Sequence, residues 1–97
     1  MNDAGIFRVL VRDPAAGGSF EEWRGRLARD GIWFTQSHPP ARRLELRFLL
    51  PGGLVEVRAG AEVLKVDREG DAFRVHARLD GLDEHGRREV ERWLEET

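Results

Sequence analysis

The residue types that most often carry catalysis are few in this chain and scattered along it. None of His38, His76 and His85 has a neighbour three or four residues away in a recognised metal-ligand pattern. Ser19 is explained as a helix cap, because Glu22 follows three residues later, and the sequence has no Gly-x-Ser-x-Gly elbow. Cysteine is absent. The sequence therefore predicts neither an enzyme nor a metal site.

Arginine is the remaining residue type suited to ligand chemistry, because its guanidinium group binds phosphate. Arg8 and Arg12 form an Arg-x-x-x-Arg motif inside a predicted strand from Ile6 to Arg12. Residues four apart on a strand share a face but stand about 13 Å from each other. We therefore interpret this pair as a solvated strand face. A phosphate clamp, with Arg26 helping, stays open as the alternative.

Trp33 is the candidate for an exposed aromatic anchor. Alternate residues of a strand point to opposite faces, so Trp33 faces outward if its apolar neighbours Ile32 and Phe34 face the core. Aromatic side chains next to arginine are typical of interaction hot spots. The equally open alternative is that Trp33 is buried under the first helix. The arginines expected beside an outward Trp33 are Arg24, Arg26 and Arg42.

Length and charge limit the class of protein. The chain has 97 residues, which we interpret as a single domain, 1–97, with one modest core. Sixteen Lys and Arg residues against 18 Asp and Glu give a net charge of −2, so no global basic field exists to collect nucleic acid. No apolar run approaches the roughly 20 residues of a membrane helix, and we see no signal peptide. We expect a cytoplasmic protein with no membrane insertion and no nucleic-acid partner.

Hydrophobic periodicity predicts a mainly β fold with two helices. After Ser19, the side chains of Phe20, Trp23 and Leu27 fall on one helical face, which predicts a short helix from Phe20 to Arg29. Strands at short spacing with tight turns favour a small antiparallel barrel of five to six strands, with a C-terminal helix packed on it. The other expected strands are Ile32–Gln36, Arg42–Leu50, Leu54–Val66 and Ala72–Leu79, and the closing helix is Asp83–Glu96.

Alternation within these strands also predicts the core. Gly60 is the expected bulge or bend of its strand, and Asp67 to Asp71 is the expected polar turn. The residues predicted to be buried are Leu44, Leu46, Phe48, Val63, Phe73 and Val75.

A succession of turns and strands resembles the PilZ-domain family, in a divergent form. Asp30-Gly31-Ile32-Trp33-Phe34 leads into a proline loop at His38-Pro39-Pro40, and Leu44 to Leu50 then runs into Pro51-Gly52-Gly53. Gly60-Ala61-Glu62-Val63 follows, and Gly81-Leu82-Asp83 opens the last helix. The resemblance implies a six-stranded barrel. It also implies a bacterial receptor or adaptor for the second messenger cyclic di-GMP, acting on motility, surface behaviour or exopolysaccharide output.

This sequence meets one of the two receptor signatures of that family and departs from the other. The Arg-x-x-x-Arg signature is met by Arg8 and Arg12. In the Asp-x-Ser-x-x-Gly signature, aligning the glycine with Gly31 places Arg26 at the Asp position and Ala28 at the Ser position. Arginine has no acceptor for the donor edge of guanine, and alanine has no polar group. We therefore expect neither a cofactor nor cyclic di-GMP binding.

Three functions stay open at this point. The first is a non-enzymatic PilZ-like adaptor that acts through protein contacts in motility or cell-surface regulation. The second is a cyclic di-GMP receptor that uses Arg8, Arg12, Arg26 and Gly31 in a non-canonical arginine site. The third is a structural or oligomerising β-barrel module, for which a homo-oligomer stays open.

Overall fold

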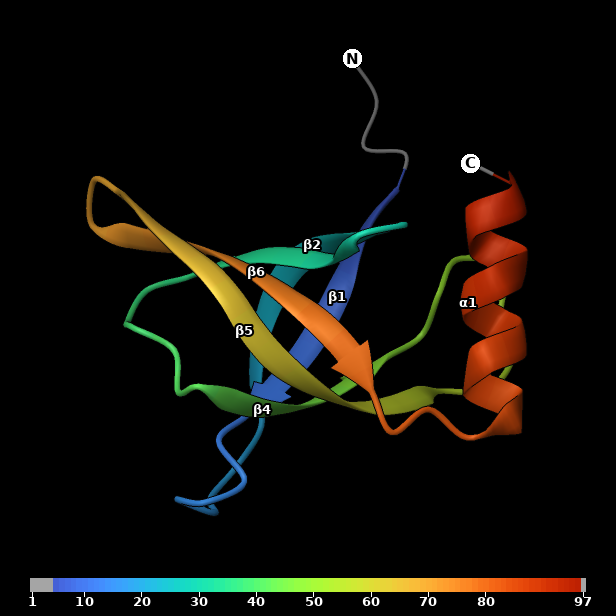
Figure 1. The fold of residues 1–97 in the computed structure, drawn as a ribbon, viewed down its shortest axis with the longest axis horizontal. Coiled ribbons are helices and arrows are strands. Elements are labelled where there is room, and N and C mark those ends of the chain that lie inside the picture. The colour runs from blue at the N-terminus through green and yellow to red at the C-terminus, as the bar shows by residue number, and fades with distance from the viewer. Residues whose placement is uncertain (1–4, 97) are drawn as a thin grey trace.

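The computed structural model describes residues 5–96, which form six strands and one helix (Figure 1). The strands close into an antiparallel barrel in the order β1-β2-β3-β6-β5-β4, and pairing of β1 with β4 completes the ring. The expected mainly β fold, with a six-stranded barrel and a C-terminal helix, is confirmed. The elements are β1 (Ile6–Arg12), β2 (Glu21–Ala28), β3 (Gly31–Gln36), β4 (Arg43–Phe48), β5 (Val57–Glu69), β6 (Ala72–Asp80) and α1 (Glu84–Glu96).

The barrel interior is filled by alternate residues of each strand, as the period-2 pattern predicts. Val9, Ile32, Leu46 and Val75 are completely buried. The prediction of a buried residue is confirmed for Leu44, Leu46, Phe48 and Val75, whereas Phe73 and Val63 are only half-buried. Both lie toward the part of the β5–β6 hairpin that runs past the barrel, where less of the core covers them.

The expected N-terminal helix is wrong, because residues 21–28 form strand β2. This strand pairs with β1 on one side and β3 on the other, so its backbone groups are satisfied by the barrel. Trp23, Gly25 and Leu27 turn inward, while the charged residues between them turn outward. Tertiary pairing thus overrides the helical spacing and the Ser19 cap signal.

The β5–β6 hairpin extends well past the barrel wall (Figure 1). The expected bulge at Gly60 is wrong: Gly60 pairs regularly with Glu45 and Asp80, and the register shifts between Val63 and Lys65. The strand also continues to Glu69, through residues expected to form a turn. Gly60 is needed for another reason, because a Cβ there would lie 2.5 Å from Oδ1 of Asp80.

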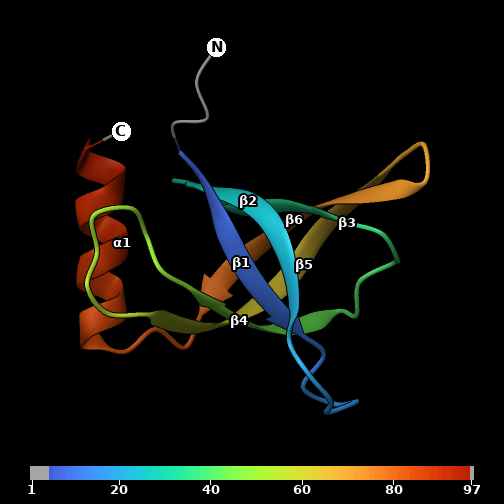
Figure 2. The same cartoon turned by 180° about the vertical axis from the view of Figure 1, so that it is seen from behind.

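Helix α1 closes one end of the barrel through its single apolar face. Trp93 is buried and meets the ring of Phe7 edge-on, with 6.3 Å between the ring centroids. Asp83 begins the helix, since its Oδ1 accepts a hydrogen bond of 2.7 Å from the backbone nitrogen of Gly86. The connection between β4 and β5 runs alongside the helix (Figures 1 and 2).

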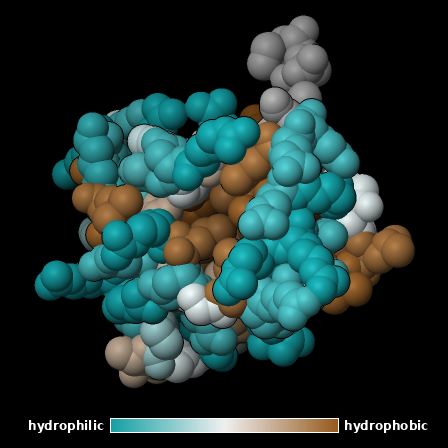
Figure 3. All heavy atoms as spheres, turned by 45° about the vertical axis from the view of Figure 1, so that its right-hand side comes forward, coloured by the Kyte–Doolittle hydropathy of each residue, from teal (hydrophilic) through white to brown (hydrophobic). Residues whose placement is uncertain are grey.

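A hollow lined mainly by apolar side chains lies between α1 and the barrel (Figure 3). Its apolar lining consists of Leu27, Ala28, Leu79, Leu82, Val90 and Leu94. Within residues 5–96, no helix has both the length and the hydropathy that a membrane crossing needs.

Candidate functional site

The outer surface of β2, β3 and β6 gathers several of the residues predicted from the sequence. Strand register places Arg26 opposite Trp33, and Trp33 opposite His76. One step along the same strands, Arg24 is opposite Thr35, which in turn is opposite Arg74. We call the outward side chains of Arg24, Arg26, Trp33, Thr35, Arg74 and His76 the Trp33 face.

Trp33 faces outward, as one of the two sequence interpretations predicts, and it is half-buried by its neighbours on the sheet surface. Its ring stacks on that of His76, with centroids 4.0 Å apart and planes 5° from parallel. Asp30 holds both rings: its Oδ1 accepts a hydrogen bond of 3.4 Å from Nε1 of Trp33, and its backbone oxygen lies 2.9 Å from Nε2 of His76. Because a carbonyl oxygen only accepts, Nε2 carries the proton in this contact.

Gly31 has a structural role at this site. Its φ of +133° is a conformation that other residues rarely adopt, and a Cβ there would lie 2.3 Å from the backbone oxygen of Ala77. This close approach lets β3 begin directly at the β2–β3 turn. Gly31 therefore fixes where Trp33 and Asp30 stand.

The arginines of the Trp33 face differ in how far they are neutralised. Arg74 lies 3.6 Å from a carboxylate oxygen of Glu69, and its guanidinium carbon is 5.3 Å from the centroid of the Trp33 ring. Arg24 and Arg26 are exposed and make no ion pair with any residue in the described part of the chain. They border an open depression of about 330 Å³ beside Trp33. Three arginines, Arg24, Arg26 and Arg74, line this depression against one carboxylate, that of Glu69, so its lining is positive on a chain whose net charge is negative.

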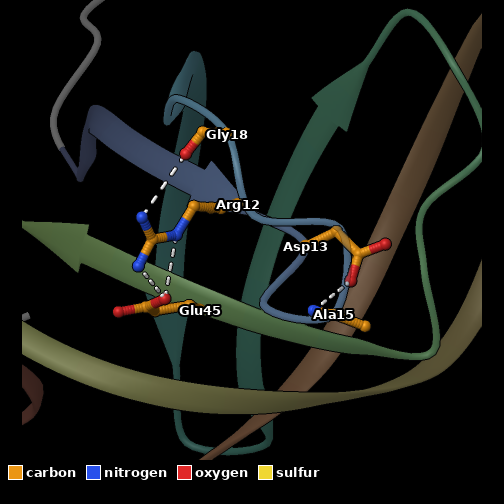
Figure 4. A network of polar contacts seen from close by, with 5 residues as sticks. All are labelled: Arg12, Asp13, Ala15, Gly18 and Glu45. Carbon is orange, nitrogen blue, oxygen red and sulfur yellow. Dashed lines mark hydrogen bonds and ion pairs between the residues drawn. The ribbon is translucent and has the colours of Figure 1, made fainter.

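Arg12 is occupied by contacts within the protein. Its Nε and Nη2 donate to one carboxylate oxygen of Glu45, at 3.0 and 2.5 Å, and Nη1 donates to the backbone oxygen of Gly18 at 3.4 Å (Figure 4). The guanidinium also lies 4.5 Å from the centroid of the Phe20 ring. We call Arg12, Glu45, Gly18 and Phe20 the Arg12 network.

Arg8 lies opposite Arg24 on the neighbouring strand and is exposed, 3.5 Å from a carboxylate oxygen of Glu22. Arg8 and Arg12 thus form ion pairs with two different carboxylates, those of Glu22 and Glu45. Arg42 stands apart from the Trp33 face, just before β4, where its backbone oxygen accepts a hydrogen bond of 2.9 Å from Val63.

Sequence reasoning missed the contribution of β6 to this site. Alternation predicts that Arg74 and His76 share the outward face of their strand, but it does not show which strand lies beside them. The pairing of β6 with β3, about 40 residues away in the chain, brings them to Trp33. The sequence marks Asp30 only as the residue before Gly31, and the folded structure shows that it holds both rings.

A second polar cluster lies at the end of β3, away from the Trp33 face. Nε2 of His38 is 2.6 Å from Oε1 of Glu21, and this hydrogen bond raises the pKa of His38. The His38 ring meets that of Trp23 edge-on, with 5.9 Å between centroids. Among residues 5–96, no group of three or more His, Cys, Asp or Glu side chains is arranged to hold a metal ion.

Comparison of the chain with family models, with curated proteins and with solved structures found no match.

Proposed function

We propose that this chain is a non-enzymatic, PilZ-like adaptor domain that binds a protein partner through the Trp33 face. The observation that supports this most is a pair of arginines, Arg24 and Arg26, that no residue among 5–96 neutralises and that lie beside a half-buried tryptophan on the outer sheet surface. The sequence resemblance adds the setting, bacterial motility or cell-surface regulation in the cytoplasm.

The chemistry of the face selects an acidic partner. Guanidinium groups bind carboxylates through paired hydrogen bonds, and Arg24 and Arg26 have none of these bonds satisfied by the described protein residues. Trp33 adds a planar apolar surface that an aromatic or aliphatic side chain of the partner can cover. The preferred partner is therefore a segment in which carboxylates alternate with apolar residues. Because the rings are already fixed by Asp30, binding costs little ordering of the site.

A cyclic dinucleotide is a second candidate ligand, for one specific reason. Parallel rings of Trp33 and His76, bordered by guanidinium groups, resemble a surface on which a nucleobase stacks next to a phosphate. Against it stand the occupied Arg12 and the absence of an acidic group at position 26. We expect no cyclic di-GMP binding at micromolar concentration.

Calorimetric titration separates these candidates. The first probe is a synthetic peptide in which glutamate alternates with phenylalanine, and the second is cyclic di-GMP. We expect the peptide to bind, and the Arg24→Ala, Arg26→Ala double variant to bind it at least about tenfold more weakly, since each arginine contributes on the order of 1 kcal/mol.

Arg87→Ala is the matched control, because it removes an exposed arginine of α1 with no ion pair to the described residues. Peptide binding that is equally weakened by Arg87→Ala would mean that only net charge matters, and the proposal would fail. A low-micromolar isotherm with cyclic di-GMP would favour the receptor instead.

A further inference from the structure

The outer half of β5 presents an open edge, separate from the Trp33 face. Strand β4 pairs with β5 only from Val57 to Glu62. In the described chain, the segment from Lys65 to Glu69 pairs with β6 alone and Leu64 lies at the register shift; all six residues from Leu64 to Glu69 are exposed. An edge of this kind carries unpaired backbone groups that a further strand can bind.

This edge combines apolar and charged side chains in a regular order. Leu64 and Val66 are 50% and 41% exposed. Lys65 and Asp67 share the opposite face of the strand, with 3.6 Å between Nζ and Oδ2. Protective edges are usually charged along their length, so two exposed apolar residues here leave the edge only partly protected.

The order of residues is self-complementary in one antiparallel register. If a two-fold axis passes through Val66, Lys65 stands opposite Asp67 of the second copy, and the reverse pair forms by symmetry. Val66 then faces Val66 of the second copy, at the centre of the contact.

The neighbouring registers lack this match. An axis through Lys65 or Asp67 opposes like charges at the centre, and an axis between Val66 and Asp67 places Lys65 opposite Arg68. The charge pattern thus favours a single register, which is what a specific contact requires.

We propose that two copies of this chain associate through the Leu64–Glu69 edges of β5, antiparallel and centred on Val66. The two β5–β6 hairpins then form one continuous sheet. Since Lys65 is opposite His76 in the β5–β6 register, and a two-fold axis normal to the sheet preserves its faces, both Trp33 faces lie on the same side. The assembly would present two copies of that face to a partner, which raises avidity without a new contact.

Sedimentation velocity from micromolar to near-millimolar concentration tests this proposal on the full chain. We expect a reversible monomer–dimer equilibrium. Lys65→Asp should weaken the dimer by about tenfold, because symmetry turns two favourable cross-strand pairs into repulsive ones. Lys65→Asp combined with Asp67→Lys exchanges the charges and restores the pairing, so its dimer should return close to the original strength.

Two variants complete the design. Val66→Lys places like charges on the axis and should abolish the dimer, while Leu54→Lys changes an equally apolar side chain that is 95% exposed on the β4–β5 connection and should leave the dimer unchanged. Circular dichroism of each variant at low concentration confirms that the monomer is folded. A monomer throughout the concentration range, a dimer lost in Leu54→Lys, or no rescue by the charge exchange would each overturn the proposal. None of these outcomes depends on the proposed function of the Trp33 face.

Discussion

The Trp33 face and the Arg12 network are two combinations of arginine with an aromatic ring on the outside of one barrel. In the Arg12 network, a guanidinium lies 4.5 Å from the Phe20 ring and donates to Glu45 and to a backbone oxygen. On the Trp33 face, Arg24 and Arg26 border the ring without an acceptor among the described residues. One arrangement uses its charge within the fold, and the other leaves its charge without an acceptor among the described residues, which is why we propose that a partner binds there.

The difference shows that arginine spacing along a strand does not indicate which arginines the fold neutralises. Arg8 and Arg12 satisfy a binding signature in sequence, yet each lies beside a carboxylate. Arg24 and Arg26 belong to no such signature, and no residue in the described part of the chain forms an ion pair with them. What distinguishes them is the residue on the neighbouring strand, which is set by register and is invisible in a single strand.

Among changes at the Trp33 face, the largest expected effect on stability comes from breaking the turn that places Trp33. Gly31→Ala should lower the free energy of unfolding by about 3 kcal/mol, because the new Cβ overlaps the backbone oxygen of Ala77 and the φ of +133° is strained. Gly70→Ala is the matched control: its φ is +63° and a Cβ there meets no atom within 4 Å. Urea unfolding of both variants measures the difference, and equal losses would mean that the close approach at Gly31 is unimportant.

Trp33→Ala should separate binding from stability. We expect it to weaken binding of the glutamate–phenylalanine peptide by about 2 kcal/mol, while the free energy of unfolding falls by only about 1 kcal/mol through loss of the His76 stack. Trp93→Ala is the contrast, since Trp93 is buried and its loss should cost about 3–5 kcal/mol of stability. If Trp33→Ala unfolds as readily as Trp93→Ala, Trp33 is a core residue.

Substitution of an arginine in the Arg12 network should destabilise the fold more than substitution of an arginine on the Trp33 face. Arg12→Ala should destabilise the protein by about 1 kcal/mol, because it removes a partly exposed ion pair with Glu45 that is held by two hydrogen bonds. Arg24→Ala should change stability by less than about 0.5 kcal/mol, as expected for an unpaired surface residue. Chemical denaturation of both variants checks this, and a loss in Arg24→Ala as large as that in Arg12→Ala would erase the distinction.

The smallest effect concerns the Glu21–His38 contact. Because the folded-state pKa of His38 is raised above its ordinary value of 6.5, the contact stabilises the fold fully below pH 6.5 and is lost as the pH rises through the folded-state pKa. Both side chains are about half exposed, so solvent screening limits the change to about 0.5 kcal/mol or less. Thermal unfolding between pH 6 and 8 should show this decline, and Glu21→Gln should remove it. A decline that persists in Glu21→Gln would assign the pH dependence to another group.

Much of the barrel is predictable from period-2 patterning. The Ile6–Arg12 strand, the buried residues of β4 and the outward side of Trp33 all follow from alternation. Strand β2 was mispredicted because Phe20, Trp23 and Leu27 also fit a helical face. The alternation of Trp23, Gly25 and Leu27 with charged residues was the signal for a strand.

The candidate site was only half predictable, because it depends on contacts between distant segments. Trp33 and the arginines of β2 were identified from residue type. Arg74 and His76 joined them only through the β3–β6 register, and the Glu45 that occupies Arg12 only through the closure of β1 on β4. Such register is fixed by packing of the whole barrel, which one sequence does not reveal.

Chemical-shift mapping of the ¹⁵N-labelled chain with the glutamate–phenylalanine peptide tests the central claim most directly. Trp33→Phe assigns the indole N–H signal of Trp33, so its response can be followed separately from those of Trp23 and Trp93. We predict that the largest shifts fall on this signal and on the backbone of β2 and β3 around Arg24, Arg26 and Trp33, with the amides of Arg12 and Glu45 unaffected. Shifts centred on the Arg12 network, or no shifts on the Trp33 face at saturating peptide, would contradict the account.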